Sequence, residues 1–82
     1  MYKVVFTERA IRDLKKLRSE ARKRIIKKIE VYSTSPEKYS VKLSHPKIGS
    51  YRFKIGDYRV IFDVIEKNIV VLRIGHRKEI YR

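Results

Sequence analysis

The second half of the chain contains a stretch, residues 51–62, that reads YRFKIGDYRVIF and predicts a β-hairpin. Gly56-Asp57 is the kind of two-residue connection that hairpins favour, because Gly can adopt the positive φ that such a turn needs. The turn sets the register of the two strands. The apolar face then pairs Ile55 with Tyr58, Phe53 with Val60 and Tyr51 with Phe62.

The opposite face of this hairpin carries positive charge. Lys54 lies directly across from Arg59, and Arg52 lies two residues along the strand. Cross-strand Cβ atoms are about 5 Å apart, so two positive heads repel by about 1 kcal/mol in water and by about 3 kcal/mol at a partly shielded dielectric of about 20. Because this repulsion lowers the stability of the fold, an anion is expected to bind between the two cations and compensate for it.

The next turn, over residues 66–68, is interpreted as a three-residue connection with Asn68 in the left-handed conformation. The core pairs are then Phe62 with Leu72 and Val60 with Ile74. This register keeps Arg73 on the polar face, whereas a two-residue turn would aim it at the core. Continued alternation places Arg77 on the polar face, together with Tyr81 if the tail stays extended.

The rest of the chain predicts helices and further strands from the periodicity of its apolar residues. The expected elements are a strand at 2–6, a helix from Glu8 to Arg18 capped by Thr7, a second helix capped by Ser19 and ending before Ser35-Pro36, an extended piece at Val41–Leu43 within a loop over 34–49, and strands at 51–55, 58–65 and 69–74 with a stub at 79–81. The fold class is α+β, in the order βααβββ, as a single domain over residues 1–82. Both helices are expected on one face of the sheet, because an antiparallel meander can leave its other face wet.

The two helices each have an apolar stripe for the core and a polar face. The stripes are Ala10, Ile11, Leu14 and Leu17 in the first helix and Ala21, Ile25, Ile29 and Tyr32 in the second. Asp13 is expected on the polar face. Candidate contacts to RNA phosphates are Arg22, Lys23 and Lys27 on the second helix and Arg73 in the sheet. An ordinary solvated face explains the basic residues of the second helix as well.

The composition is strongly basic. Among 82 residues, 22 Lys and Arg stand against 9 Asp and Glu, which gives a formal charge of +13. Self-repulsion of this size favours a polyanionic or acidic partner, with nucleic acid as the leading candidate, although a solubility device or a thermophile-like bias explains it too. With no Cys and only 2 His, no metal or other cofactor is expected. No apolar run could span a membrane, so a soluble, cytoplasmic protein is expected.

The polar face of the predicted sheet suits cleavage of RNA without a metal. Its residues are Arg52, Lys54, Arg59, Arg77 and Tyr81. This reaction needs a base for the 2′-hydroxyl proton, cations that stabilise the phosphorane and a donor for the leaving 5′-oxygen. Arginine forks onto two phosphate oxygens, and cations around a tyrosine would let it act as the base. A surface that only binds phosphate explains the pattern as well.

The hairpin sequence, followed by GHRKEIYR at residues 75–82, resembles the RelE/ParE toxin superfamily of prokaryotic toxin–antitoxin modules. The likeness extends to the N-terminal strand, the helical hairpin and Lys42-Leu43. The RelE branch implies a ribosome-dependent mRNA endonuclease that acts in the A site and is neutralised by a RelB-like antitoxin wrapped around it in a heteromeric complex.

The resemblance also implies roles for five residues of this sequence. Tyr81 or a basic neighbour would be the general base, and Lys54 and Arg59 would hold the scissile phosphate. Arg77 would be a stabiliser or an acid. Arg52 stands where the better-known pattern has a lysine, which leaves its role open.

The resemblance leaves two alternative functions open, as well as the roles of two histidines. The ParE branch poisons DNA gyrase, generally without this basic and tyrosine set, and an inactive relative would only bind its antitoxin. Other nucleases of the superfamily use a Glu and a His. Here the register points His76 to the core face, which favours a structural role, and His45 in the loop is a weaker candidate still.

Overall fold

A computed structural model describes residues 2–44 and 48–81 of the chain. Its elements are β1 (Lys3–Phe6), α1 (Glu8–Lys15), α2 (Ser19–Tyr32), α3 (Pro36–Tyr39), β2 (Ser40–Lys42), β3 (Tyr51–Ile55), β4 (Tyr58–Ile65) and β5 (Asn68–His76). The α+β class and the predicted order are confirmed. The sequence does not predict the short helix α3. The extended piece expected at Val41–Leu43 is present as β2, which begins and ends one residue earlier. The centre of the predicted loop, with His45, lies outside the described residues.

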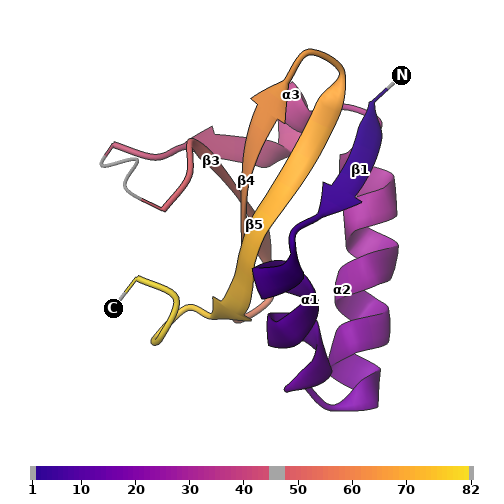
Figure 1. The fold of residues 1–82 in the computed structure, drawn as a ribbon, viewed down its shortest axis with the longest axis vertical. Coiled ribbons are helices and arrows are strands. Elements are labelled where there is room, and N and C mark those ends of the chain that lie inside the picture. The colour runs from indigo at the N-terminus through magenta and orange to yellow at the C-terminus, as the bar shows by residue number, and fades with distance from the viewer. Residues whose placement is uncertain (1, 45–47, 82) are drawn as a thin grey trace.

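The strands form one five-stranded sheet in the order β1-β5-β4-β3-β2 (Figure 1). β1 runs parallel to β5, and the other neighbours are antiparallel. Both α1 and α2 pack on one face of this sheet, as predicted. The core between the layers consists of Ala10, Leu14, Ile25, Ile29, Phe53, Ile55, Val60, Phe62, Ile69, Val71 and Ile74. Among the described residues, no helix is long and apolar enough to cross a membrane.

The hairpin of β3 and β4 has the predicted register. Its apolar pairs are Ile55–Tyr58, Phe53–Val60 and Tyr51–Phe62, and Lys54 is paired with Arg59. Gly56 has a φ of 57°, in the left-handed region that the turn requires. The cross-strand pair of cations is therefore confirmed as a feature of the fold.

The second turn differs from its prediction. Ile65 pairs with Asn68, so the connection has two residues, and Glu66, with a φ of 57°, takes the left-handed conformation expected of Asn68. A bulge in β5 then leaves Leu72 with no residue paired opposite it on β4. The pair of Val60 with Ile74 is confirmed, but Phe62 pairs with Val71. The extra residue lies within β5 instead of the turn, which restores the same register further along.

Helix α1 begins as predicted but faces the sheet differently. The Ala10 N–H donates to Thr7 Oγ1 at 3.1 Å, which confirms the cap, whereas the helix ends at Lys15 and not at Arg18. Ile11 is 41% exposed and Asp13 only 7%, so the predicted orientation is wrong for both residues. The reason is that α1 lies along the edge of β5 beyond the end of β1. The predicted cap at Ser19 is wrong, because Ser19 is the first residue of α2 and the N-cap position is occupied by Arg18, which makes no side-chain cap bond.

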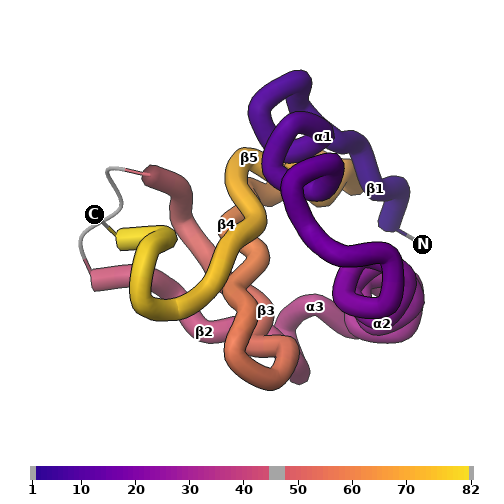
Figure 2. The backbone as a smooth tube through the Cα atoms, turned by 90° about the horizontal axis from the view of Figure 1, so that it is seen from below, coloured from indigo at the N-terminus to yellow at the C-terminus, as the bar shows by residue number. Residues whose placement is uncertain are grey.

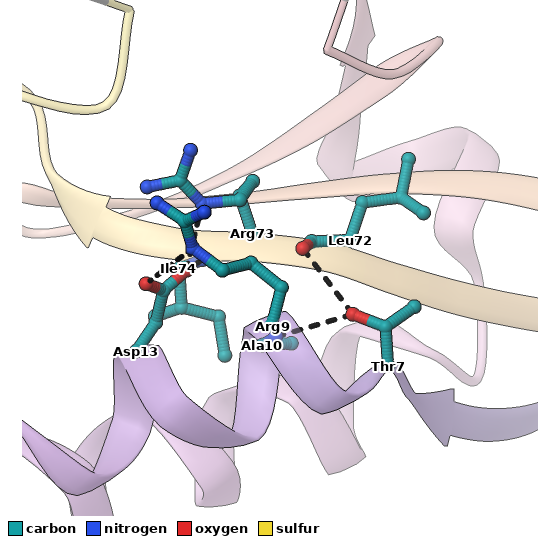
Figure 3. A network of polar contacts seen from close by, with 7 residues as sticks. All are labelled: Thr7, Arg9, Ala10, Asp13, Leu72, Arg73 and Ile74. Carbon is teal, nitrogen blue, oxygen red and sulfur yellow. Dashed lines mark hydrogen bonds and ion pairs between the residues drawn. The ribbon is translucent and has the colours of Figure 1, made fainter.

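The carboxylate of Asp13 connects α1 to β5 (Figure 3). Its Oδ2 accepts the backbone N–H of Ile74 and the Nε–H of Arg73, each at 2.9 Å. Its Oδ1 lies 3.6 Å from Nε of Arg9. Because the N–H of Ile74 lies beyond the part of β5 that β1 pairs with, the side chain of Asp13 completes the strand edge there.

The sheet face that points away from the helices, here called the outer face, is partly apolar. Ile61 and Ile80 are buried there, and a Cβ at Gly75 would lie 3.1 Å from Cδ1 of Ile80. Residues 77–81 form a turn whose Ile80 N–H donates to the His76 carbonyl at 2.9 Å, so the predicted strand stub at 79–81 is wrong. The expected wet face thus has a small core of its own, which anchors the C-terminal turn.

Candidate functional site

The five predicted site residues lie on the outer face, between the middle of β3 and the hairpin tip. They come from β3, β4 and the turn after β5, and we call Arg52, Lys54, Arg59, Arg77 and Tyr81 the cation face. The start of β4 pairs with the end of β5, and the C-terminal turn that follows lies on the side of the molecule away from α2 (Figure 2). Strand pairing, more than sequence proximity, brings these residues together.

Arg52 and Tyr81 are in direct contact. Nη1 of Arg52 donates to the phenolic oxygen of Tyr81 at 3.2 Å, and Tyr81 is 47% exposed. Nε of Arg52 is buried and has no hydrogen-bond partner among the described residues. A buried donor without a partner is unfavourable. Because Nε is buried, an anion would reach this guanidinium through its other donors.

Arg59 is held by the hairpin tip. Its exposed fraction is 7%, and its Nη1 donates to the carbonyls of Gly56 at 3.0 Å and Tyr58 at 2.9 Å. These carbonyls fix the guanidinium without neutralising its charge. Lys54 is exposed directly across from it. The pair therefore consists of a rigid cation that is largely buried, Arg59, and an exposed one, Lys54.

Arg77 is attached to the same hairpin tip. Its backbone N–H donates to the Asp57 carbonyl at 2.8 Å, and its Nε lies 3.5 Å from Oδ1 of Asp57. Both side chains are more than half exposed, at 55% and 65%, so the ion pair is weak and leaves Arg77 available to a ligand. The turn after β5, and not an extended tail, places Arg77 and Tyr81 beside the strands.

The predicted RNA-binding residues are not brought into this cluster. Arg22, Lys23 and Lys27 lie on α2, which packs against the other face of the sheet (Figure 2). Arg73 is opposite Ile61 in the register, but its guanidinium is bonded to Asp13 of α1. None of these four cations therefore joins the cation face.

One basic residue near the site was missed. Arg24 of α2 reaches the hairpin tip, since a Cβ at Gly56 would collide with its Nη2. It is one of three consecutive basic residues, so only the packing of α2 against β3 distinguishes it.

His76 lies on the core face, as its register predicts. It pairs with Tyr58, its ring lies edge-on to that tyrosine at 5.8 Å between centroids, and its Nδ1 accepts the Lys78 N–H at 3.1 Å. These contacts favour a structural role. In residues 2–44 and 48–81, no three His, Asp or Glu side chains gather as a metal site would require.

Comparison with known proteins places this arrangement in a family. The family model of the ParE toxin of type II toxin–antitoxin systems matches residues 4–81. Toxin RelE3 of Methanocaldococcus jannaschii is 36% identical over 83 residues, covering 96% of this chain and 94% of the relative.

Solved structures give the same result. The Mycobacterium tuberculosis RelBE2 toxin–antitoxin complex contains a chain with a TM-score of 0.84 and 28% identity, covering 93% of this chain and 98% of that one. The RelE–RelB complex of Pyrococcus horikoshii has a TM-score of 0.73 and 27% identity, with coverage of 95% and 97%. The fold is thus that of a toxin from a toxin–antitoxin module. The chain belongs to the ParE toxin family, within the RelE/ParE superfamily.

Proposed function

We propose that residues 1–82 act as one toxin domain that cleaves messenger RNA in the ribosomal A site, in the cytoplasm. The observation that carries the proposal is the contact of Arg52 with Tyr81 beside the opposed Lys54 and Arg59. The relative named RelE3 and the RelE-containing neighbours support this branch of the superfamily.

The cation face supplies the groups that the reaction needs without a cofactor. Tyr81, held by Arg52, is positioned to take the 2′-hydroxyl proton as the 2′-oxygen attacks phosphorus. Lys54 and Arg59 neutralise the charge that develops on the non-bridging oxygens, and the fixed guanidinium of Arg59 needs little reorganisation. Arg77, which is exposed, acts as the acid that gives the 5′-oxygen a proton as its bond to phosphorus breaks, and the 2′-oxygen keeps its new bond in a 2′,3′-cyclic phosphate.

A RelB-like antitoxin is the proposed inhibitory partner. The two solved neighbours described above are complexes of a toxin with its antitoxin. A formal charge of +13 on a small core favours a partner with an acidic or mixed segment. The antitoxin and this chain are expected to form a heteromeric complex in which toxicity is blocked.

A second candidate function is inhibition of DNA gyrase. The observation that favours it is the match to the ParE family model over residues 4–81. On this alternative the cation face would bind a protein or DNA, and no chemistry would take place there.

The test is cleavage of an mRNA on stalled ribosomes, with the cut position read by primer extension. The wild type is expected to cut in the A site, and Arg77→Ala and Tyr81→Phe are expected to lose cleavage while keeping the fold, since both side chains are exposed. Lys15→Ala, on the exposed surface of α1, serves as the control. Intact message together with lowered gyrase supercoiling activity would favour the second candidate.

A further inference from the structure

A cavity of about 250 Å³ lies beyond the open edge of β5, between α1 and the C-terminal turn. Its floor is apolar and largely buried, formed by Leu17, Tyr58, Ile74 and Ile80. Its rim is basic and more exposed, formed by Arg9, Lys16 and Arg73. None of these residues belongs to the cation face, so the cavity is a separate candidate site.

The rim keeps positive charge that the protein does not neutralise. Asp13 lines the cavity but already accepts from Arg73 and from the Ile74 N–H, with Arg9 at 3.6 Å. Lys16 makes no ion pair within the described parts of the chain. Glu79 is the other carboxylate at the cavity, and it too forms no ion pair there.

A basic rim over an apolar floor fits a ligand with two parts. Methylene groups would cover the floor, and an anionic head would meet Lys16 and the free donors of Arg9 and Arg73. A glutamate or aspartate side chain has this composition. A phosphate chain does not, because it brings no apolar stem and would carry successive charges past Asp13 and Glu79.

We propose that this cavity receives an acidic side chain of the antitoxin. The inference rests on the proposed antitoxin partner and is independent of whether the cation face cleaves RNA. The cavity would then give the antitoxin a point of attachment outside the reactive surface. The carboxylate of the partner would also offset part of the positive charge of this chain.

The test compares Lys16→Gln with Lys15→Gln. Both lysines are exposed at the end of α1 and both changes remove one charge, but only Lys16 lines the cavity. Binding of each purified variant to the antitoxin encoded beside the gene is measured by isothermal titration calorimetry at fixed salt. Lys16→Gln is expected to weaken binding by about five- to tenfold, the effect of one partly shielded ion pair, and Lys15→Gln by less than about twofold. Melting temperatures check that both variants fold.

A double-mutant cycle then identifies the partner group. Each Asp or Glu of the antitoxin is changed to its amide, and one of these changes is expected to lose its effect in the Lys16→Gln background. Equal effects of Lys15→Gln and Lys16→Gln, with no coupled carboxylate, would overturn the cavity assignment alone. Weaker binding of Lys16→Gln to a ribosomal RNA fragment, with antitoxin binding unchanged, would make the cavity a phosphate site. A wild type that binds no antitoxin would overturn the proposed partner as well.

Discussion

Arg52 donates a hydrogen bond to the phenolic oxygen of Tyr81 at 3.2 Å, across a separation of 29 positions in the sequence. The bond joins an internal strand of the sheet to the turn that follows β5. Ile80, the neighbour of Tyr81, is buried on the outer face, so the turn is anchored one residue before the phenol. The position of Tyr81 is therefore set by packing as well as by the hydrogen bond.

Tyr81→Phe is expected to reduce mRNA cleavage by about a hundredfold or more, the contribution of a general base. The ring and its packing remain, so the free energy of unfolding should fall by no more than about 1 kcal/mol, the value of one exposed hydrogen bond. Single-turnover cleavage on stalled ribosomes and urea unfolding measure the two quantities. Full cleavage by this variant would assign the base to another residue of the cation face.

Lys54→Gln is expected to separate stability from activity. Removing the charge opposite Arg59 relieves a repulsion, which should raise the free energy of unfolding by up to about 1 kcal/mol. Cleavage should fall by about tenfold to a hundredfold, because one cation no longer meets the phosphate. Lys15→Gln is the control for the loss of one exposed lysine. A destabilised Lys54→Gln protein would show that the pair is not repulsive in the fold.

Asp13→Ala is expected to destabilise the protein by about 2–3 kcal/mol, because Arg73 and the Ile74 N–H both lose their acceptor. Asp13→Asn keeps an oxygen for the Ile74 N–H and should lose less. Arg9→Ala removes only the exposed partner and should cost less than about 0.5 kcal/mol. Urea unfolding of the three variants checks this order, and equal losses for Asp13→Ala and Arg9→Ala would contradict it.

Glu66→Gly is expected to stabilise the protein by about 0.5–1 kcal/mol, since glycine removes the strain of a side chain at positive φ. Asn68→Gly should instead destabilise it by about 0.5–1 kcal/mol, because Asn68 is the first residue of β5. Thermal unfolding of both variants distinguishes the two-residue turn from the three-residue one. The opposite signs would favour the three-residue turn.

Neutralising Arg22, Lys23 and Lys27 together is expected to weaken ribosome binding and to reduce its dependence on salt, with the site of cleavage unchanged. These side chains lie on α2, away from the cation face, so they would contact phosphates without taking part in chemistry. Ribosome pelleting over a salt series provides the measurement. An unchanged salt slope would show that α2 is only a solvated surface.

The hairpin of β3 and β4 could be predicted from sequence to the residue. Gly56-Asp57 permits one short turn, and alternation of apolar residues on either side permits one register. The convergence of Arg52, Lys54 and Arg59 followed from that register. The sequence also predicts Tyr81 near them, but through an extended tail; in the structure a turn anchored by its own Ile80 brings Tyr81 there instead.

The predictions of the second turn and of the orientation of α1 are wrong because more than one local structure fits the same sequence pattern. A three-residue turn and a two-residue turn with a bulge at Leu72 both pair Val60 with Ile74, and nothing in Glu66 signals a left-handed residue. The exposure of Ile11 and the burial of Asp13 depend on where β1 ends along β5. That position is a property of the assembled sheet and leaves no trace in the periodicity of α1.

The parallel pairing of β1 with β5 has a consequence for synthesis on the ribosome. Lys3 pairs with Asn68, so β1 has no strand partner in the described sheet until β5 has emerged. Contacts between residues so far apart in sequence form late and slowly. Arg77 and Tyr81 are translated later still. The helical hairpin is therefore the part of a nascent chain that can form early, whereas the cation face is assembled only in the final stage of folding.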